Sequence, residues 1–299
     1  MTDYKKILLT GASGFIGSYI LEELRSAGIA PDTLSRQQGA TYVCDLEHDT
    51  PALETCYDAV IHAAGTDEKG RADALNNEGT KRLLKALDGT PPRHITYLSS
   101  VHVYGSDPGT DVEESCFLRP DTEYSRSKIR AEKALEKWCA EHGTTLTILR
   151  PALTAGRGMH GRLAVMAEAV ARGRYMHLRG NPAVRSLVMA DDVARAARLT
   201  LGVPGVFNVS DGIAHSVISI ADAMAANLGT DKHVLSFPAG LAKWLLRLCP
   251  LKKTRKAYAK LTTSATFSNK ALTEATGLKP YDTVEVMARR HPEYPYRES

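Results

Sequence analysis

The sequence predicts an α/β fold in which a doubly wound parallel sheet is followed by a smaller C-terminal lobe. Short apolar runs alternate with helical segments over about the first 150 of the 299 residues, and a glycine-rich turn joins the first run to the first helix. From Pro151 onward the pattern becomes irregular, with apolar helices interrupted by glycine, proline and short strands. The early alternation implies right-handed crossovers between parallel strands, with helices covering both faces of the sheet.

The elements can be placed in order along the chain. The run from Lys5 to Leu9 has a charged start and an apolar end, which suits a buried parallel strand. Ile16, Ile20 and Leu24 recur at helical spacing and predict a helix over 15–26. Further strands are expected at 32–35, 40–43, 59–62, 95–98 and 145–149, and further helices near 72–87 and 125–142.

The glycine turn has the spacing G-x-x-G-x-x-G. Gly11 permits the tight turn, Gly14 lets the backbone approach a pyrophosphate, and Gly17 lets the helix pack close to the strand. The amino end of the helix would then face the phosphates of a dinucleotide. The alternative is a strand-to-helix turn that binds no ligand. Under the first interpretation, the cofactor-binding residues here are Gly11, Ser13, Gly14, Phe15, Ile16 and Gly17.

A second feature is the segment Tyr124-Ser-Arg-Ser-Lys128, which the pair Ser99-Ser100 precedes. A phenol has a free pKa of about 10, so it needs a nearby cation to act as an acid or base at neutral pH. Lys128 lies one helical turn after Tyr124 and can supply that cation. Ser100 would hydrogen-bond the substrate oxygen and stabilise charge there. The alternative is the start of an ordinary amphipathic helix with a solvated lysine.

Together, these features resemble the extended short-chain dehydrogenase/reductase family, also described as the NAD-dependent epimerase/dehydratase family. The resemblance implies a Rossmann-type dinucleotide-binding domain over 1–150, to which segments near 185–210 return. It also implies a substrate-binding lobe over 151–299 and a homodimer. Further cofactor contacts are implied from Asp45, Leu46, Ala63, Ala64, Gly65, Asn76, Tyr124, Lys128 and Pro151.

The residues after Ser100 bear on the reaction. Family members that dehydrate nucleotide sugars place an Asp-Glu pair close after the catalytic hydroxyl, whereas this chain has Val101-His102. This difference argues against dehydration and leaves carbonyl/alcohol redox or epimerisation. His102 could touch the substrate, or it could be a packed side chain at a strand end.

The C-terminal half is most similar to nucleotide-sugar 4-epimerases and 4-keto reductases. The likeness lies in segments 149–163, 172–188 and 260–280. It departs from the family pattern at 154–157 and at Arg162, which stands where the family has a nucleotide-contacting Asn. Arg185 suits phosphate oxygens, or it forms a salt bridge to a nearby aspartate, Asp191 or Asp192. The residues assigned to substrate binding are Ser100, His102, Tyr124, Arg162 and Arg185.

The end of the second predicted strand bears on the choice of cofactor. A site that prefers NAD usually has an acid there to bind the ribose 2′-hydroxyl. This chain has Ser35 followed by Arg36, and a guanidinium suits a 2′-phosphate. We therefore expect NADP(H) to be favoured over NAD(H). The alternative is that Arg36 is a solvated loop residue and NAD is used.

Composition excludes several classes of protein. The 38 Lys and Arg against 34 Asp and Glu leave a net charge of +4, which makes no case for nucleic acid. The five cysteines lack C-x-x-C spacing, and no secretory signal or transmembrane run is visible, so a cytoplasmic location is expected. The ten histidines are dispersed, and we expect no metal site. The basic stretch within 241–260 is a solvated face, a phosphate-steering surface or a membrane-surface contact.

These observations predict an NAD(P)-dependent oxidoreductase or epimerase that acts on a nucleoside-diphosphate sugar, as a 4-epimerase or a 4-keto reductase. Its catalytic set would be Ser100, Tyr124 and Lys128. One alternative is an NADP-dependent reductase of a non-nucleotide ketone or alcohol. Another is a binding protein that senses NADP(H) without turnover.

Overall fold

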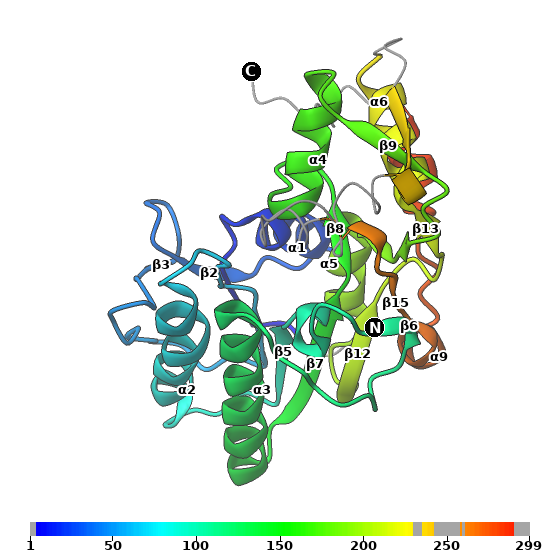
Figure 1. The fold of residues 1–299 in the computed structure, drawn as a ribbon. Coiled ribbons are helices and arrows are strands. Elements are labelled where there is room, and N and C mark those ends of the chain that lie inside the picture. The colour runs from blue at the N-terminus through cyan, green and yellow to red at the C-terminus, as the bar shows by residue number, and fades with distance from the viewer. Residues whose placement is uncertain (1–3, 230–234, 242–257, 259–260, 290–299) are drawn as a thin grey trace.

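The structure is a computed structural model that describes residues 4–229, 235–241, 258 and 261–289. Its centre is a seven-stranded parallel sheet (Figure 1). The strands lie in the order β12-β7-β5-β4-β1-β2-β3, so the winding reverses between β1 and β4. Their bounds are β1 Ile7–Thr10, β2 Asp32–Ser35, β3 Tyr42–Val43, β4 Ala59–His62, β5 His94–Leu98, β7 Thr145–Pro151 and β12 Gly205–Val209.

Alternating residues of β1 enter two separate cores, because successive side chains of a strand point to opposite faces of the sheet. Ile7 and Leu9 pack with helices α1 (Phe15–Ser26) and α5 (Ala190–Leu199). Leu8 packs with α2 (Thr80–Leu87) and α3 (Glu123–His142), which lie side by side (Figure 1). The predicted doubly wound sheet with helices on both faces is therefore confirmed.

Two predicted elements differ from the structure. The third strand is only Tyr42–Val43, and the helix expected over 72–87 divides into a π-helix, Ala74–Gly79, followed by α2. Within the π-helix Asn76 turns inward, and the Thr80 hydroxyl donates to the Asn76 carbonyl at 2.6 Å. Gly79 lies against the Leu46 carbonyl, where a Cβ atom would come within 3.0 Å. The spacing of apolar residues does not predict these tertiary contacts, so it does not predict the π-helix.

Part of the C-terminal half packs on the main domain, and the remainder forms the lobe. β12 pairs with β7 at the sheet edge, and α5 packs on α1. A third core lies among α4 (Gly161–Ala171), α6 (Val217–Asn227) and α10 (Thr283–Ala288). Beyond β12, α9 spans Lys270–Thr276 and contacts the β12 strand.

Three small sheets lie outside the main sheet. One has the order β13-β10-β15-β6, one pairs β11 with β8, and one pairs β14 with β9. Their bounds are β6 Gly109–Val112, β8 Leu153–Ala155, β9 Met176–Arg179, β10 Val184–Arg185, β11 Leu187–Met189, β13 His215–Ser216, β14 Leu235–Pro238 and β15 Ala265–Phe267. Because β6 joins β15, a segment from the first half of the chain contributes to the lobe. In the described residues, no helix has the length and apolar character needed to span a membrane.

Candidate active site

The glycine turn lies at the carboxyl end of β1, beside the point where the winding of the sheet reverses. A Cβ atom on Gly11 would come within 2.6 Å of the Ala64 amide nitrogen, and one on Gly17 within 1.9 Å of the Gly11 carbonyl oxygen. Gly14 begins α1 without a side-chain hydrogen bond to the first turn, and Ser13 and Gly14 are exposed. The uncapped amides of this helix fit a dinucleotide pyrophosphate.

The segment after β4 lies next to this turn. The Ala64 amide donates to the Thr10 hydroxyl at 3.2 Å. A Cβ atom on Gly65 would come within 2.9 Å of Asn76 Oδ1 and 3.1 Å of Lys128 Nζ, so a larger residue would require these side chains to shift.

Asn76 was predicted to contact the cofactor, but the structure buries it completely. Its Oδ1 accepts from the Thr66 amide at 2.8 Å, and its Nδ2 donates to the Thr66 carbonyl and to Ser127 Oγ, both at 2.9 Å. Both polar atoms of the Asn76 side chain therefore have hydrogen-bond partners within the protein. Asn76 therefore fixes the position of the 65–66 segment through its hydrogen bonds to the Thr66 backbone.

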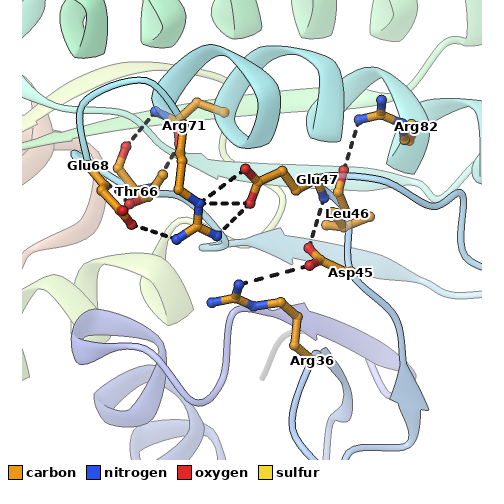
Figure 2. A network of polar contacts seen from close by, with 9 residues as sticks. Arg36, Asp45, Leu46, Glu47, Thr66, Glu68, Arg71 and Arg82 are labelled. Atoms are coloured by element: carbon orange, nitrogen blue, oxygen red, sulfur yellow. Dashed lines mark hydrogen bonds and ion pairs between the residues drawn. The ribbon is translucent and has the colours of Figure 1, made fainter.

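A network of charges surrounds the segment that follows β3 (Figure 2). Arg36 is largely exposed, and its Nη1 lies 3.9 Å from Asp45 Oδ2. The Leu46 carbonyl accepts from Arg82 at 3.0 Å. The predicted residues Arg36, Asp45 and Leu46 are thus brought together at one end of the candidate cofactor site.

Sequence reasoning missed the strongest ion pair of this network. The guanidinium of Arg71 binds both carboxylate oxygens of Glu47, at 2.5–3.1 Å, and also contacts Glu68 (Figure 2). The Arg71 guanidinium lowers the pKa of Glu47. This pair joins the loops that follow β3 and β4. The two residues are 24 positions apart, and no sequence pattern predicts a contact at that separation.

The predicted catalytic residues Ser100, Tyr124 and Lys128 also converge. Ser100 follows β5 and begins the short 3₁₀ helix η2 (Val101–Tyr104). Tyr124 and Lys128 lie in the first two turns of α3, whose start is fixed by a capping box between Thr122 and Ser125. The Ser100 hydroxyl lies close enough to the Tyr124 phenol to lower its pKa.

Burial sets the pKa values of both titratable groups. It raises the pKa of Tyr124 to about 12, with a smaller rise from Asp67 and a lowering from the Ser100 hydroxyl. It lowers the pKa of Lys128 to about 8, while Glu132 acts in the opposite direction. We expected the ammonium to lower the pKa of the phenol. Instead Lys128 Nζ donates to the Leu98 carbonyl at 2.6 Å and lies 6.0 Å from the centre of the Tyr124 ring.

A buried polar network supports the serine pair. The Ser99 hydroxyl donates its proton to Glu132. The Glu132 carboxylate binds Arg150 in a two-pronged contact at 2.6 and 3.1 Å, and Arg150 donates to the Tyr104 hydroxyl at 2.9 Å. Tyr104 in turn donates to Asn208 at 2.9 Å. Sequence reasoning treated Arg150 only as a marker before the buried Pro151 and did not find this network.

A pocket with about 520 Å³ of empty space, part of it open to solvent, lies beside this set. His102, Arg162 and Arg185 line it. Burial and the neighbouring charge of Arg162 both lower the pKa of Arg185. Arg185 donates to the carbonyls of Val184 and Thr263. Asp192, one of the two acids considered for Arg185, pairs with Arg195 at 2.7 Å.

Two groups of acidic and imidazole side chains lie close enough together to be considered as metal ligands. They are Asp45, Glu47 and His48, and Asp211, His215 and Asp282. In the second group, Asp211 accepts from His215 at 2.7 Å and from the amides of Ile213 and Thr283. The basic stretch considered for membrane contact lies outside the described residues, except for Leu241 and Tyr258.

The sequence model described as the NAD dependent epimerase/dehydratase family matches residues 7–210. The chain belongs to this family. It is therefore an NAD(P)-dependent enzyme of the extended short-chain type, as the glycine turn, the serine pair and the Tyr124–Lys128 segment together predicted.

Two relatives illustrate the similarity of this chain to known sugar epimerases. UDP-glucose 4-epimerase of Yersinia pestis is 30% identical over 279 residues, which cover 75% of this chain and 82% of the relative. The N-acetyl-α-D-glucosaminyl-diphospho-ditrans,octacis-undecaprenol 4-epimerase of Escherichia coli O157:H7 is 27% identical and covers 65% of this chain. The chain spans only 62% of that relative's length.

Solved structures of similar fold contain either nicotinamide cofactor. UDP-glucose 4-epimerase of Thermus thermophilus, in complex with NAD, has a TM-score of 0.72 at 22% identity and covers 95% of this chain and 96% of its own. RMD of Pseudomonas aeruginosa, complexed with NADPH, has a TM-score of 0.75 at 22% identity and covers 96% and 97%. At this identity the likeness shows the fold. A nicotinamide cofactor is supported, and the preference between NAD and NADP is not decided by these structures.

Proposed function

We propose that this enzyme acts on a nucleoside-diphosphate sugar, as a 4-epimerase or a 4-keto reductase, through Ser100, Tyr124 and Lys128. The observation that carries the proposal is the pair of guanidinium groups, Arg162 and Arg185, in the pocket next to Ser100 and Tyr124. Two adjacent cations, one of them half-buried, suit the two negative charges of a diphosphate. The activities named for the relatives are consistent with this substrate class.

In this proposal each residue has a separate task. A bound nicotinamide supplies or accepts the hydride. Tyr124 gives a proton to the sugar oxygen or takes one from it, and Ser100 hydrogen-bonds that oxygen. Lys128, whose pKa is about 8, is mostly an ammonium at pH 7 and would hydrogen-bond the nicotinamide ribose.

In this proposal the exposed guanidinium of Arg36 binds the 2′-phosphate of NADP(H), which favours NADP(H) over NAD(H). Arg36 lies 3.9 Å from Asp45, another residue assigned to cofactor binding. The remaining cofactor contacts assigned from the sequence, the homodimer and the cytoplasmic location stay predictions.

Thermal unfolding tests the substrate class. Uridine or thymidine diphosphate at millimolar concentration should raise the melting temperature, since a ligand that binds only the folded state stabilises it. Arg185→Ala should abolish that rise and keep the rise produced by NADP(H). Arg172→Ala is the control, because Arg172 is an exposed arginine that pairs with Glu168 on α4.

If neither nucleoside diphosphate changes the melting temperature of the wild type, the nucleotide-sugar proposal fails. A reductase of a non-nucleotide ketone then becomes the better proposal. The bonds from Arg185 to the Val184 and Thr263 carbonyls favour this second candidate, because they occupy donors that a phosphate would use. A sensor without turnover would bind NADP(H) and reduce no ketone.

A further inference from the structure

The loop over 65–71, between β4 and the π-helix, lies against the nicotinamide end of the site, which is the end that holds Tyr124 and Lys128. Its first residue is a glycine, and a Cβ atom there would come within 3.1 Å of Lys128 Nζ. The Gly70 amide donates to Glu123 Oε2 at 3.2 Å. Glu123 directly precedes Tyr124 in the first turn of α3, so the loop is bonded to the helix that carries the phenol.

The last residue of the same loop, Arg71, is bonded to the adenosine end of the site, which holds Arg36, Asp45 and Leu46 (Figure 2). The Arg71 guanidinium binds both carboxylate oxygens of Glu47 at 2.5–3.1 Å, and the Glu47 side chain is only 9% exposed. The Glu47 amide donates to Asp45 Oδ1 at 3.0 Å. The other carboxylate oxygen of Asp45 lies 3.9 Å from Arg36. A line of contacts therefore runs from Arg71 to the residues assigned to the adenosine.

The sheet places the cofactor between these two loops. In the strand order β4-β1-β2-β3, the loops after β4 and β3 flank the carboxyl ends of β1 and β2. The glycine turn follows β1, and Arg36 follows β2. Ligands of parallel α/β sheets bind at such strand ends. The pair between Arg71 and Glu47 therefore joins the loops on either side of the dinucleotide site.

We propose that Arg71 is a positioning residue for the cofactor, and that its pair with Glu47 sets the separation between the adenosine and nicotinamide ends of the site. The proposal rests on the two ends assigned under the proposed function. A two-pronged pair suits this task, because the planar guanidinium fixes the orientation of the carboxylate as well as its distance.

The cofactor is a ligand with two linked halves. Once one half is bound, the second half binds intramolecularly, and the gain in affinity depends on the distance between the two sites. Loops that are already held at the right separation also avoid the cost of being ordered when the ligand binds. A ligand that fills only one end of the site gains nothing from the separation. Loss of the pair should therefore weaken the whole dinucleotide and not its adenosine half.

Binding of whole and half cofactors tests this role. The whole ligand is NADPH or NADH, whichever the wild type binds more tightly. The matching half ligand is adenosine 2′,5′-bisphosphate for NADPH or ADP for NADH. Titration calorimetry measures the Kd of the whole ligand, and its displacement measures that of the half ligand. We expect Arg71→Ala to raise the Kd of the dinucleotide about tenfold and that of the half ligand less than about twofold.

Two further variants sharpen the comparison. Glu47→Gln removes the charge of the partner and keeps its size, so it should cause a similar loss. Because the two residues act as one pair, the double variant should bind the dinucleotide no more weakly than either single variant. Arg130→Ala is the control, since Arg130 is an exposed arginine that pairs with Asp73. It should change neither Kd.

The pattern of losses decides the outcome. A loss confined to the dinucleotide, shared by both single variants and not additive, supports the positioning role. Equal losses for whole and half ligands, additive losses, or no loss overturn it and leave the cofactor assignment standing. A wild type that binds neither dinucleotide overturns the assigned cofactor site and the role of Arg71 with it. The melting temperature without ligand shows whether each variant is folded, and Glu47→Gln supplies the same comparison if Arg71→Ala does not fold.

Discussion

At the residues proposed to be catalytic, burial shifts two pKa values in opposite directions. It raises the pKa of Tyr124 to about 12 and lowers that of Lys128 to about 8. Both shifts favour the neutral form, because the low-dielectric interior penalises charge. Tyr124 is therefore protonated at neutral pH and suited to give a proton to a carbonyl oxygen.

Tyr124→Phe should lower turnover by roughly 10² or more, since the ring remains and the proton carrier is lost. Binding of NADP(H), measured by thermal shift, should persist. Lys128→Met should impair both turnover and cofactor binding. Tyr281→Phe, on an exposed tyrosine, is the control. Near-normal turnover of Tyr124→Phe would show that this phenol is not the acid or base.

Arg36 provides a separate test of cofactor choice. If its guanidinium binds the 2′-phosphate, Arg36→Ala should weaken NADP(H) binding by about 1.5–3 kcal/mol and leave NAD(H) nearly unchanged. Titration calorimetry with both cofactors measures the difference. Arg93→Ala, on an arginine of similar exposure near Asp58, should change neither. Equal losses for the two cofactors, or a wild type that prefers NAD, would contradict the assignment.

At the scale of the element, the start of α3 determines where the Tyr124 phenol lies. The Thr122 side chain accepts from the Ser125 amide at 3.0 Å, and the Ser125 hydroxyl accepts from the Thr122 amide at 3.1 Å. Tyr124 lies inside this capping box, so fraying of the first turn would displace the phenol from Ser100.

Thr122→Ala should therefore lower the free energy of unfolding by about 0.5–2 kcal/mol and also reduce turnover. Urea unfolding and steady-state rates measure the two effects. Ser216→Ala removes the corresponding cap of α6, where Ser216 accepts from the Ser219 amide at 2.9 Å. It should lose similar stability without a specific loss of turnover. Equal turnover losses in the two variants would show that the α3 cap has no special role in placing Tyr124.

For the whole molecule, buried histidines link stability to pH. His62 is fully buried between the hydroxyls of Thr10 and Thr80, and burial lowers its pKa to about 3, with a further lowering from Lys128. The folded state thus keeps His62 neutral while the unfolded chain protonates it near its ordinary pKa of 6.5. Its contribution to stability is present above pH 6.5 and is lost as the pH falls toward 3.

His62→Gln should make the free energy of unfolding less dependent on pH in that range. Below pH 6 the wild type should lose up to about 1.4 kcal/mol per pH unit more than the variant, which corresponds to one proton. Urea unfolding at several pH values between about 4 and 7 measures this difference. His48→Gln, on an exposed loop, should follow the wild type. Parallel curves for the wild type and His62→Gln would contradict the low pKa.

The sequence by itself determined the order of the elements, the glycine turn and the helix that carries Tyr124 and Lys128, because these depend on local spacing. The helix over 15–26 and the strands over 32–35 and 59–62 have the predicted bounds. Tyr124 and Lys128 share a helix face because they are four residues apart.

Only the tertiary structure decided which polar groups meet. The pairing of Arg71 with Glu47, the inward turn of Asn76 and the bonds of Glu132 to Ser99 and Arg150 join segments far apart in the chain. Burial depends on the whole molecule, and it sets the pKa values of Tyr124 and Lys128. From their spacing we expected Lys128 to lower the pKa of Tyr124, whereas burial raises it.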